Sequence, residues 1–518
     1  MMNWSDGYHT EALYTYGYYK ELSPTLQRLA VLLAGYEGLP ASDGDVHMEL
    51  GFGQGVSINI HAASQKGHYI GDDFNPSHVV HAQQLAQAAQ LDADLSDASF
   101  AEMAARTDLP MCNSISLHGI WSWINDANRA HITSIIKRCL KPGGIVYNSY
   151  NSVSGHAGFL PWRDMMWQHY ELQTGSALER IDLTIKHFSD MFEKNPSLLE
   201  QNPALKTTWQ RIQTSDRHYL LHEYFNANWD CFSLSQVAED MAAAKMQFVG
   251  TTNNNQYINH LAMDEGRLAQ VQAQTSPLAA EMWRDALLGN TFRQDLFVKG
   301  GRKLGNAEIL RRLRQVKFVA VVDGETFANF LFSTQDSRRF HDDLFDAVKN
   351  TIFADHASPK TFAELQVAVD TKYDWTHILQ VLVLKINAGQ LQPCLDTVEA
   401  VAQQRCHDLN QLLLQQLDDK IAGVYVASPV TGMGISLDFV QAWGVRGVLQ
   451  DAKTTDLAIA EQIWQCLQNN QRVLIDGEGN GLSGHDSHIA LLLTQLASMR
   501  LRLPNWEALG LLPNSNKA

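Results

Sequence analysis

One stretch constrains this chain more than any other: Val46-His47-Met48-Glu49-Leu50-Gly51-Phe52-Gly53-Gln54-Gly55. An apolar run leads into three closely spaced glycines, and an apolar segment from Val56 to Ala63 follows. This pattern predicts a short strand, a tight turn and a helix, which together open a doubly wound α/β fold. Glycine at the turn lets a ligand approach bare main chain. The spacing is not the G-x-G-x-x-G of dinucleotide-binding folds, because position 56 is Val.

The acid that precedes the turn narrows the choice of ligand. Glu49 stands two residues before Gly51, where a carboxylate is poorly suited to a polyphosphate. The same carboxylate can hold the cationic amino group at the methionyl end of S-adenosyl-L-methionine (SAM). Gly51, Phe52, Gly53 and Gly55 would then complete this part of the site. A glycine-rich strand-to-helix turn without a ligand is the alternative for this stretch taken alone.

A second acid follows the next predicted strand, His68 to Gly71. A carboxylate at the tip of the second strand, roughly 20 residues after the glycines, can accept both hydroxyls of a ribose. We assign this role to Asp73, next to Phe74, because side chains alternate along a strand and a G-x-D spacing is usual; Asp72 then becomes a turn residue. An acid at a strand end can also cap a helix, although Asn75 or Ser77 can supply that cap.

The third predicted strand is weaker and lies within residues 91–100. In a SAM site, the acid that leaves this strand would meet the adenine amino group, and Asp97 with Ala98 fits that place. The alternative is that Asp97 or Ser99 only caps the helix that begins after it.

The fourth predicted strand, Asn113 to Leu117, ends at His118. The loop after this strand borders the transfer site in such a fold, so His118 is a candidate for cofactor binding and for catalysis as a general base. A histidine at a strand end can instead bond to the backbone. Trp121 and Trp123, in the same loop, could wall a substrate channel or belong to the core.

The run Leu140-Lys141-Pro142-Gly143-Gly144 predicts the end of a helix and a turn into the fifth strand. Tyr150 and Asn151 lie just beyond that strand, where polar side chains could hold an incoming amine. Near the N-terminus, Tyr14 and Tyr19 belong to a tyrosine-rich segment before a predicted helix that starts at Pro24. That segment could be a lid over the cofactor or part of a half-buried helix.

Together these motifs carry a resemblance. Residues 1 to about 170 resemble class I SAM-dependent methyltransferases. The runs H-G-I-W-S-W-I from His118 and S-Y-N from Ser149 resemble the H-G-V-Y-S-W-V and S-Y-N of bacterial methyltransferases with a methyltransferase regulatory domain. Residues 219–229 and 292–298 resemble the start and end of that domain. The chain departs from the pattern at Trp121, where the family has tyrosine, and at Gly155-His156, where it often has P-G-W.

The resemblance implies a seven-stranded Rossmann-like core, followed by mostly helical regulatory and C-terminal domains. It implies SAM as the cofactor and methyl transfer to protein lysine side chains, since the characterised branch acts on outer-membrane proteins. Two alternatives remain open: a small-molecule methyltransferase, and a SAM-responsive regulator without enzymatic activity. The N/D-P-P-Y motif of enzymes that methylate nucleic-acid amino groups does not stand after the fourth strand.

We expect four parts: a SAM-binding methyltransferase domain with an N-terminal lid helix over 1–170, a helical regulatory domain over 171–300, a winged-helix-like module over 301–395, and a C-terminal helical domain over 396–518. In the third part, the predicted helix from Trp375 to Asn387 is too apolar to lie in a DNA groove. This composition favours a core helix in a protein-interaction or dimerising module.

Charge and cysteine usage exclude several classes of function. The net charge of −16 disfavours nucleic acid and anionic membranes as partners. Six scattered cysteines without a C-x-x-C pair argue against a metal site or a disulfide framework. No apolar run is long enough to span a membrane, and the N-terminus lacks a signal-peptide pattern. We therefore expect a cytoplasmic protein.

Overall fold

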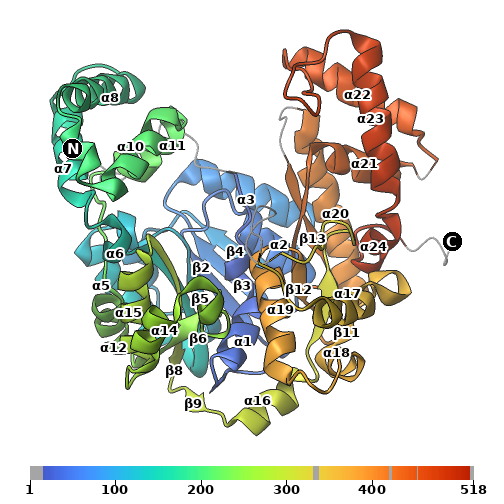
Figure 1. Ribbon diagram of the computed structural model, residues 1–518, viewed down its shortest axis with the longest axis horizontal. Coiled ribbons are helices and arrows are strands. Elements are labelled where there is room, and N and C mark those ends of the chain that lie inside the picture. Colours follow the sequence, from blue (N-terminus) through green and yellow to red (C-terminus); the bar gives the residue numbers. More distant parts are fainter. Residues whose placement is uncertain (1–15, 331–337, 419–422, 452, 514–518) are drawn as a thin grey trace.

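A seven-stranded sheet lies at the centre of the molecule, and helices cover both of its faces (Figure 1). The computed structural model describes residues 16–330, 338–418, 423–451 and 453–513. The strand order is β4-β3-β2-β5-β6-β8-β7. These strands are β2 (Val46–Leu50), β3 (His68–Asp72), β4 (Ala93–Ser96), β5 (Cys112–Leu117), β6 (Leu140–Asn151), β7 (Met246–Thr251) and β8 (Phe292–Lys299). All neighbours are parallel except β8, which runs against β6 and β7. The expected doubly wound, seven-stranded α/β core is confirmed.

Local signals in the sequence place the helices that flank these strands. They are α1 (Pro24–Leu33), α2 (Val56–Ser64), α3 (Pro76–Ala88), α4 (Phe100–Ala105) and α5 (Asp126–Cys139). Asn75 caps α3 by accepting from the Ser77 amide, with Pro76 in the first turn. Ser99 forms a capping box with Glu102 at the start of α4. Strand β6 begins at Leu140, so the predicted turn residues already belong to the strand.

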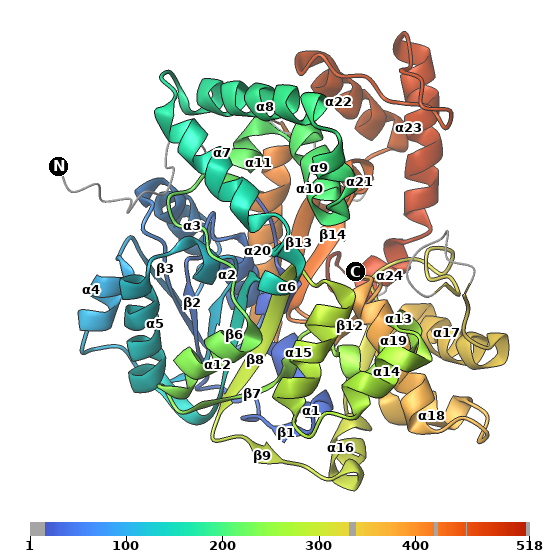
Figure 2. The ribbon, with the colours of Figure 1, turned by 60° about the vertical axis from the view of Figure 1, so that its left-hand side comes forward.

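Strands β7 and β8 come from the segment 171–300, which we expected to be helical. Met246–Thr251 and Phe292–Lys299 are buried along most of their length and extend the sheet beyond β6. Four helices of the same segment pack near this end of the sheet (Figure 2). They are α12 (Leu234–Ala242), α13 (Asn259–Ala262), α14 (Glu265–Gln272) and α15 (Pro277–Leu288). The part of this segment from residue 234 on therefore completes the core sheet.

Between β6 and α12, a run of helices forms a lobe that rises above one side of the central sheet, at the upper left of Figure 1. The helices are α6 (Val153–His156), α7 (Leu160–Leu172), α8 (Ala177–Lys194), α9 (Ser197–Glu200), α10 (Pro203–Thr214) and α11 (Arg217–Tyr224). The lobe has its own apolar core, in which Tyr170, Phe188 and Trp209 are buried. His222 and Glu223 lie on α11.

The part after residue 300 opens with β9 (Arg302–Lys303), which pairs with β1 (Tyr36–Glu37). Next come α16 (Asn306–Leu313), β10 (Lys317–Ala320), α17 (Asp342–Ala357), β11 (Lys360–Thr361), α18 (Phe362–Ala368), α19 (Trp375–Asn387) and β12 (Leu391–Pro393). The strands form a small antiparallel sheet in the order β11-β10-β12, with the helices packed against it. Most of α19, including Leu382 and Lys385, is buried. Its apolar residues pack within this chain, as expected for a core helix.

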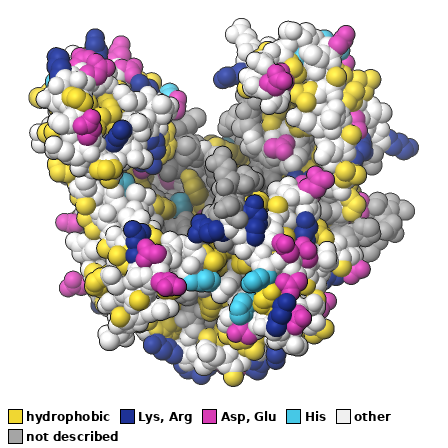
Figure 3. All heavy atoms as spheres, viewed as in Figure 1, with side chains coloured by type: hydrophobic (Ala, Val, Ile, Leu, Met, Phe, Trp, Pro, Cys, Tyr) yellow, Lys and Arg dark blue, Asp and Glu magenta, His cyan; other side chains and the backbone are white. Residues whose placement is uncertain are grey.

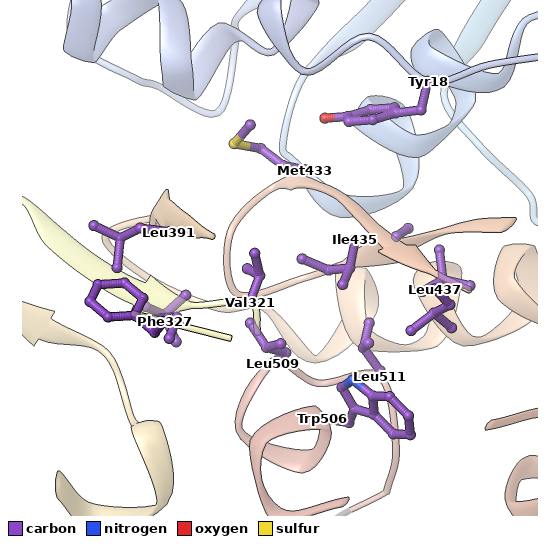
Figure 4. Close-up of a cluster of buried hydrophobic side chains, with 14 of the residues drawn as sticks. Tyr18, Val321, Phe327, Leu391, Met433, Ile435, Leu437, Trp506, Leu509 and Leu511 are labelled. Carbon is purple, nitrogen blue, oxygen red and sulfur yellow. The ribbon is translucent and has the colours of Figure 1, made fainter. Parts of the chain in front are cut away.

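The C-terminal part contains a hairpin as well as helices. The hairpin is β13 (Val424–Ser428) with β14 (Met433–Leu437), and the helices are α20 (Ala400–Gln415), α21 (Phe439–Gln450), α22 (Asp456–Asn469), α23 (His485–Arg500) and α24 (Leu503–Ala508). Figure 4 shows that β14 joins Tyr18, Val321 and Trp506 in one apolar cluster. This cluster connects the N-terminal segment to the last third of the chain. Among the described residues, no helix is long and apolar enough to cross a bilayer.

Candidate active site

A cleft of about 940 Å³ lies where the carboxyl ends of β2, β3, β4 and β5 meet. This is the edge of a doubly wound sheet at which such folds bind their ligands. Most of its lining comes from the loops that follow these strands. The lining residues are Gly51, Gly53, Asp72, Asp73, Phe74, His78, Ala98, Ser99, Phe100, His118, Gly119, Ile120, Trp123, Ile124, Asn128 and Asn228.

The glycine turn brings main chain to the cleft. Gly51 has a φ of +74°, and a Cβ there would lie 2.3 Å from Ile120 Cδ1. The Gly53 amide donates to Asp73 Oδ2 at 2.8 Å. Phe52 packs into the core, and Gly55 caps α2 against Ala82, so neither lines the cleft. Phe52 and Gly55 therefore shape the turn from behind, which corrects the expectation that they line the site.

Asp73 lines the cleft directly after the end of β3. Besides Gly53, its carboxylate accepts from the Asn75 amide at 3.0 Å and lies 3.1 Å from His78 Nδ1. Phe74 and Ala98 also line the cleft, as expected. These contacts fix the carboxylate at the tip of β3.

Asp72 is the last residue of β3 and also lines the cleft, although the sequence placed it in a turn. Its carboxyl is almost fully buried, and among the described residues Oδ1 has no hydrogen-bond partner. Burial and the nearby Asp73 raise the pKa of Asp72 well above its ordinary value. A buried polar atom without a partner marks a place where a ligand can bind.

Glu49 lies at the end of β2 and is buried. Burial, with a smaller contribution from Asp73, raises its pKa to about 8. The strand register places Glu49 in one row with Ser116 on β5 and Tyr147 on β6. Glu49 is not among the residues that line the cleft, and it stands directly behind the turn. A cation that reached this carboxyl would favour its ionised form.

His118 combines a place at the cleft with a tightly packed ring. Its Nδ1 lies 2.8 Å from the Tyr147 hydroxyl, and its ring stacks on Tyr19 at 4.0 Å between centroids. Phe292 meets the ring edge-on at 5.9 Å. Burial lowers the pKa of His118 to about 3, so the imidazole is neutral at physiological pH. Tyr19 supports His118 and does not line the cleft, while Tyr14 lies outside the described residues.

Tyr150 and Asn151 do not reach the cleft. The Tyr150 side chain is fully buried, and its hydroxyl donates to Asp295 Oδ2 at 2.5 Å. Asn151 is also buried, and its main-chain amide donates to Ser122. Because side chains alternate along β6, Tyr150 points to the face opposite Tyr147. This corrects the expectation that Tyr150 and Asn151 hold an incoming amine.

The two tryptophans divide between core and cleft. Trp121 is fully buried in the apolar core beneath the cleft, so it cannot wall a channel. Trp123 lines the cleft and also packs against the core of the α7–α11 lobe. Asp97 is exposed and lies outside the cleft, whereas Ser99, which caps α4, lines it. The position of Asp97 thus gives no support to the expected adenine contact.

Several lining residues were missed from the sequence. His78 comes from α3, and Phe100, Ile120, Ile124 and Asn128 come from the two loops that follow β4 and β5 and the helices α4 and α5 that these loops enter. His78, Phe100 and Asn128 lie in none of the runs quoted above, and apolar contact with a ligand needs shape more than residue identity. Ile120 and Ile124 lie in the run from His118, and Asn228 lies in the run 219–229, so these three residues had a usable signal. Across the described residues, no group of three or more His, Cys, Asp or Glu could hold a metal ion.

Sequence comparisons find a family model that matches one segment and relatives that match larger parts of the chain. Residues 216–299 match a family model described as a predicted methyltransferase regulatory domain. The uncharacterised protein sll1526 of Synechocystis sp. is 30% identical over 484 residues, which cover 92% of this chain and 93% of that protein. The uncharacterised protein RP789 of Rickettsia prowazekii is 22% identical over 282 residues, which cover 52% of this chain and 49% of that protein.

Solved structures show the same fold along the chain. The structure of PKMT2 from Rickettsia typhi in complex with AdoHcy has a TM-score of 0.67 at 17% identity, covering 96% of this chain and 99% of PKMT2. A second PKMT2 structure gives a TM-score of 0.66 at 16% identity. Three observations point to the same family: the strand order of the central sheet, the match of residues 216–299 to the regulatory-domain model, and the full-length likeness to sll1526. The chain belongs to the family of class I methyltransferases that carry a methyltransferase regulatory domain.

Proposed function

We propose that this protein transfers the methyl group of SAM to protein lysine side chains at the cleft. The observation that carries this proposal is the pairing of a bare glycine turn, Gly51 to Gly53, with the buried carboxyls of Asp72 and Asp73 at the next strand end. The PKMT2 structure, which shares this fold, contains AdoHcy, the molecule that remains after SAM has lost its methyl group.

The residues of the cleft fit SAM. Asp73 would accept the ribose hydroxyls, and the orphaned Asp72 Oδ1 offers a further contact in the same region. Apolar surface from Phe100 and Ile120 suits the adenine. The ammonium of the methionyl end would favour the ionised form of Glu49, whose pKa burial holds at about 8.

Bound SAM would supply a methyl group already activated on a sulfonium, so the protein mainly has to align the acceptor. A lysine acceptor must be neutral to react. Apolar surroundings disfavour the charged ammonium, and Trp123 and Phe292 provide such surroundings near His118. His118, with a pKa of about 3, is too weak a base to take up the proton, so the proton leaves to solvent.

The shape of the molecule supports a macromolecular acceptor. The α7–α11 lobe and the C-terminal helices α21–α23 stand apart at the top of the molecule, and a gap separates their upper parts (Figure 3). A chain segment could enter such a gap more readily than a buried pocket. Within this proposal, an outer-membrane protein is the expected substrate and a homodimer is the expected assembly.

The test uses SAM with an isotopically labelled methyl group. The protein is incubated with fractionated bacterial extract, with outer-membrane proteins separated from other proteins and from small molecules, and mass spectrometry locates the label. Label on lysines of a protein fraction supports the proposal and identifies the substrate. Label only among small molecules overturns the lysine acceptor, and bound SAM without any transfer overturns the enzymatic function.

A further inference from the structure

A hydrogen-bonded chain runs from the regulatory segment to the cleft. His118 Nδ1 lies 2.8 Å from the Tyr147 hydroxyl. Ser149 and Gln294 pair in register across β6 and β8 on the same face as Tyr147, within reach of its hydroxyl. Asn253 Nδ2 in turn donates to Gln294 Oε1 at 3.2 Å. Gln294 and Asn253 both belong to the residues 216–299 that match the regulatory domain. The regulatory segment thus reaches a cleft residue through the side chains of Gln294 and Tyr147.

The donors and acceptors along this series of side chains indicate which group donates to which. Because Gln294 accepts from Asn253 through its oxygen, its amide NH₂ is the group left to donate to Tyr147. Ser149 Oγ accepts from the Gly119 amide at 2.8 Å, so its hydroxyl proton is also free to point at Tyr147. The phenol oxygen then accepts from both. Its single proton goes to His118 Nδ1.

A neutral imidazole that accepts at Nδ1 must carry its proton on Nε2. Burial keeps His118 neutral and raises the pKa of Tyr147 well above 10, so both groups hold the protonation that this requires. Stacking on Tyr19 and the edge contact with Phe292 restrict the orientation of the ring. His118 consequently offers the cleft a hydrogen-bond donor.

We propose that the regulatory segment, through Gln294 and Tyr147, holds His118 as a neutral donor for the carboxylate of the methionyl end of SAM. This inference rests on the proposed function. Glu49 pairs in register with Ser116. His118 follows two residues later, just past the end of β5, and its contact with Tyr147 keeps it on the same face as Ser116. Glu49 and His118 are therefore diagonal neighbours on adjacent strands, at a spacing that suits the two charged groups of one amino-acid end. Glu49 meets the ammonium, and the His118 Nε2–H meets the carboxylate.

The first experiment measures the affinity of two ligands by calorimetry: SAM and decarboxylated SAM, which lacks the carboxylate. We expect Tyr147→Phe and Gln294→Leu each to weaken SAM binding by roughly three- to tenfold. Binding of decarboxylated SAM should not change. The matched control is Gln247→Leu. Gln247 lies on β7, next to β8, and its Nε2 donates to the Tyr36 hydroxyl at 3.2 Å, so this variant also removes a Gln–Tyr hydrogen bond, but one away from the cleft. It should alter neither affinity.

The second experiment observes the tautomer directly. Nitrogen NMR of protein labelled with ¹⁵N-histidine, with His118→Asn to identify the signals, reports which ring nitrogen carries the proton. We expect Nε2–H in the wild-type protein and a shift toward Nδ1–H in Tyr147→Phe. Such a change would not follow from a merely structural role of Tyr147.

Two results would overturn the inference: Nδ1–H in the wild-type protein, or equal losses for both ligands in Tyr147→Phe. Either result leaves the proposed function standing, provided that the wild-type protein binds SAM. If the wild-type protein does not bind SAM, the proposed function fails. The NMR measurement then still decides the tautomer.

Discussion

Tyr147 and Tyr150 lie three residues apart on β6, yet they belong to different chemical environments. Both rings are fully buried, and both hydroxyls are hydrogen-bonded. The Tyr147 hydroxyl meets His118, a residue of the cleft. The Tyr150 hydroxyl meets Asp295, which is buried with Arg293 in an ion network. We refer to the two sides of the sheet as the Tyr147 face and the Tyr150 face.

The difference shows that the face of a strand, and not closeness to its end, decides which side chain serves the site. On the Tyr150 face, Arg293 binds Asp295 at 2.7 Å and Asp285 at 2.5 Å, so both carboxyls have a partner of opposite charge within the protein. On the Tyr147 face, no cation of the described residues lowers the pKa of Glu49. The buried charges of the Tyr150 face have their partners within the protein, whereas Glu49 on the Tyr147 face would gain its charge partner from a bound ligand.

Breaking the Tyr150 face should have the largest effect. Asp295→Ala leaves the Tyr150 hydroxyl without its acceptor and takes from Arg293 a buried partner. Removing one partner of a buried ion pair costs about 3–5 kcal/mol of unfolding free energy. Urea denaturation followed by circular dichroism measures this loss, while calorimetry on the folded protein should find unchanged SAM affinity. A drop in SAM affinity without loss of stability would mean that the Tyr150 face takes part in the site.

The two tryptophans sharpen the same contrast. Trp121→Ala should cost about 3–5 kcal/mol of stability, because the ring is fully buried in the core. Trp123→Ala should cost less, because this ring is only partly buried, and should weaken SAM binding because it lines the cleft. Denaturation curves and SAM titrations of both variants test this. Equal stability losses with no effect on SAM binding would contradict the assignment of Trp123 to the cleft.

Glu49 predicts an effect that is modest at any one pH step and accumulates over several pH units. Its folded pKa of about 8 lies above that of an unfolded glutamate, about 4.3, so between these values the folded state binds more protons. The stability of the SAM-free protein should therefore fall as pH rises from about 4.3 to 8, by at most about 1.4 kcal/mol per pH unit, and then level off. Glu49→Gln removes this slope. Melting temperatures of the wild-type and Glu49→Gln proteins across this pH range measure the difference. If the two profiles run parallel, the raised pKa of Glu49 is refuted.

The sequence predicted the parts of the fold that depend on local signals. Glycine spacing, the cap at Asn75 and strand-length apolar runs located the first five strands of the sheet. The addition of β7 and β8 was not predicted. Strand β8 pairs with β6 across more than 140 residues and β7 pairs with β8, and such distant pairing leaves no local trace. The hairpin β13–β14 was missed for the same reason, since its burial depends on contacts with α2 and α20.

The candidate site divides in a similar way. Gly51, Gly53 and Asp73 were found because backbone conformation and strand ends restrict which residues can stand there. The S-Y-N motif indicates Tyr150 by its position along the strand. A motif does not show which distant residue each tyrosine hydroxyl will bind. Asp295 and His118, which decide the two roles, lie 145 and 29 residues away from their tyrosines.

The most direct test of the account is a calorimetric titration with SAM of the wild-type protein, Asp73→Ala and Asp97→Ala. Asp97 is the matched control, an exposed acid at the end of the neighbouring strand and outside the cleft. We predict one SAM per chain for the wild-type protein, at least about tenfold weaker binding for Asp73→Ala, equivalent to about 1.4 kcal/mol, and unchanged binding for Asp97→Ala. No binding to the wild-type protein, or equal affinities for all three, would contradict a SAM site at this cleft.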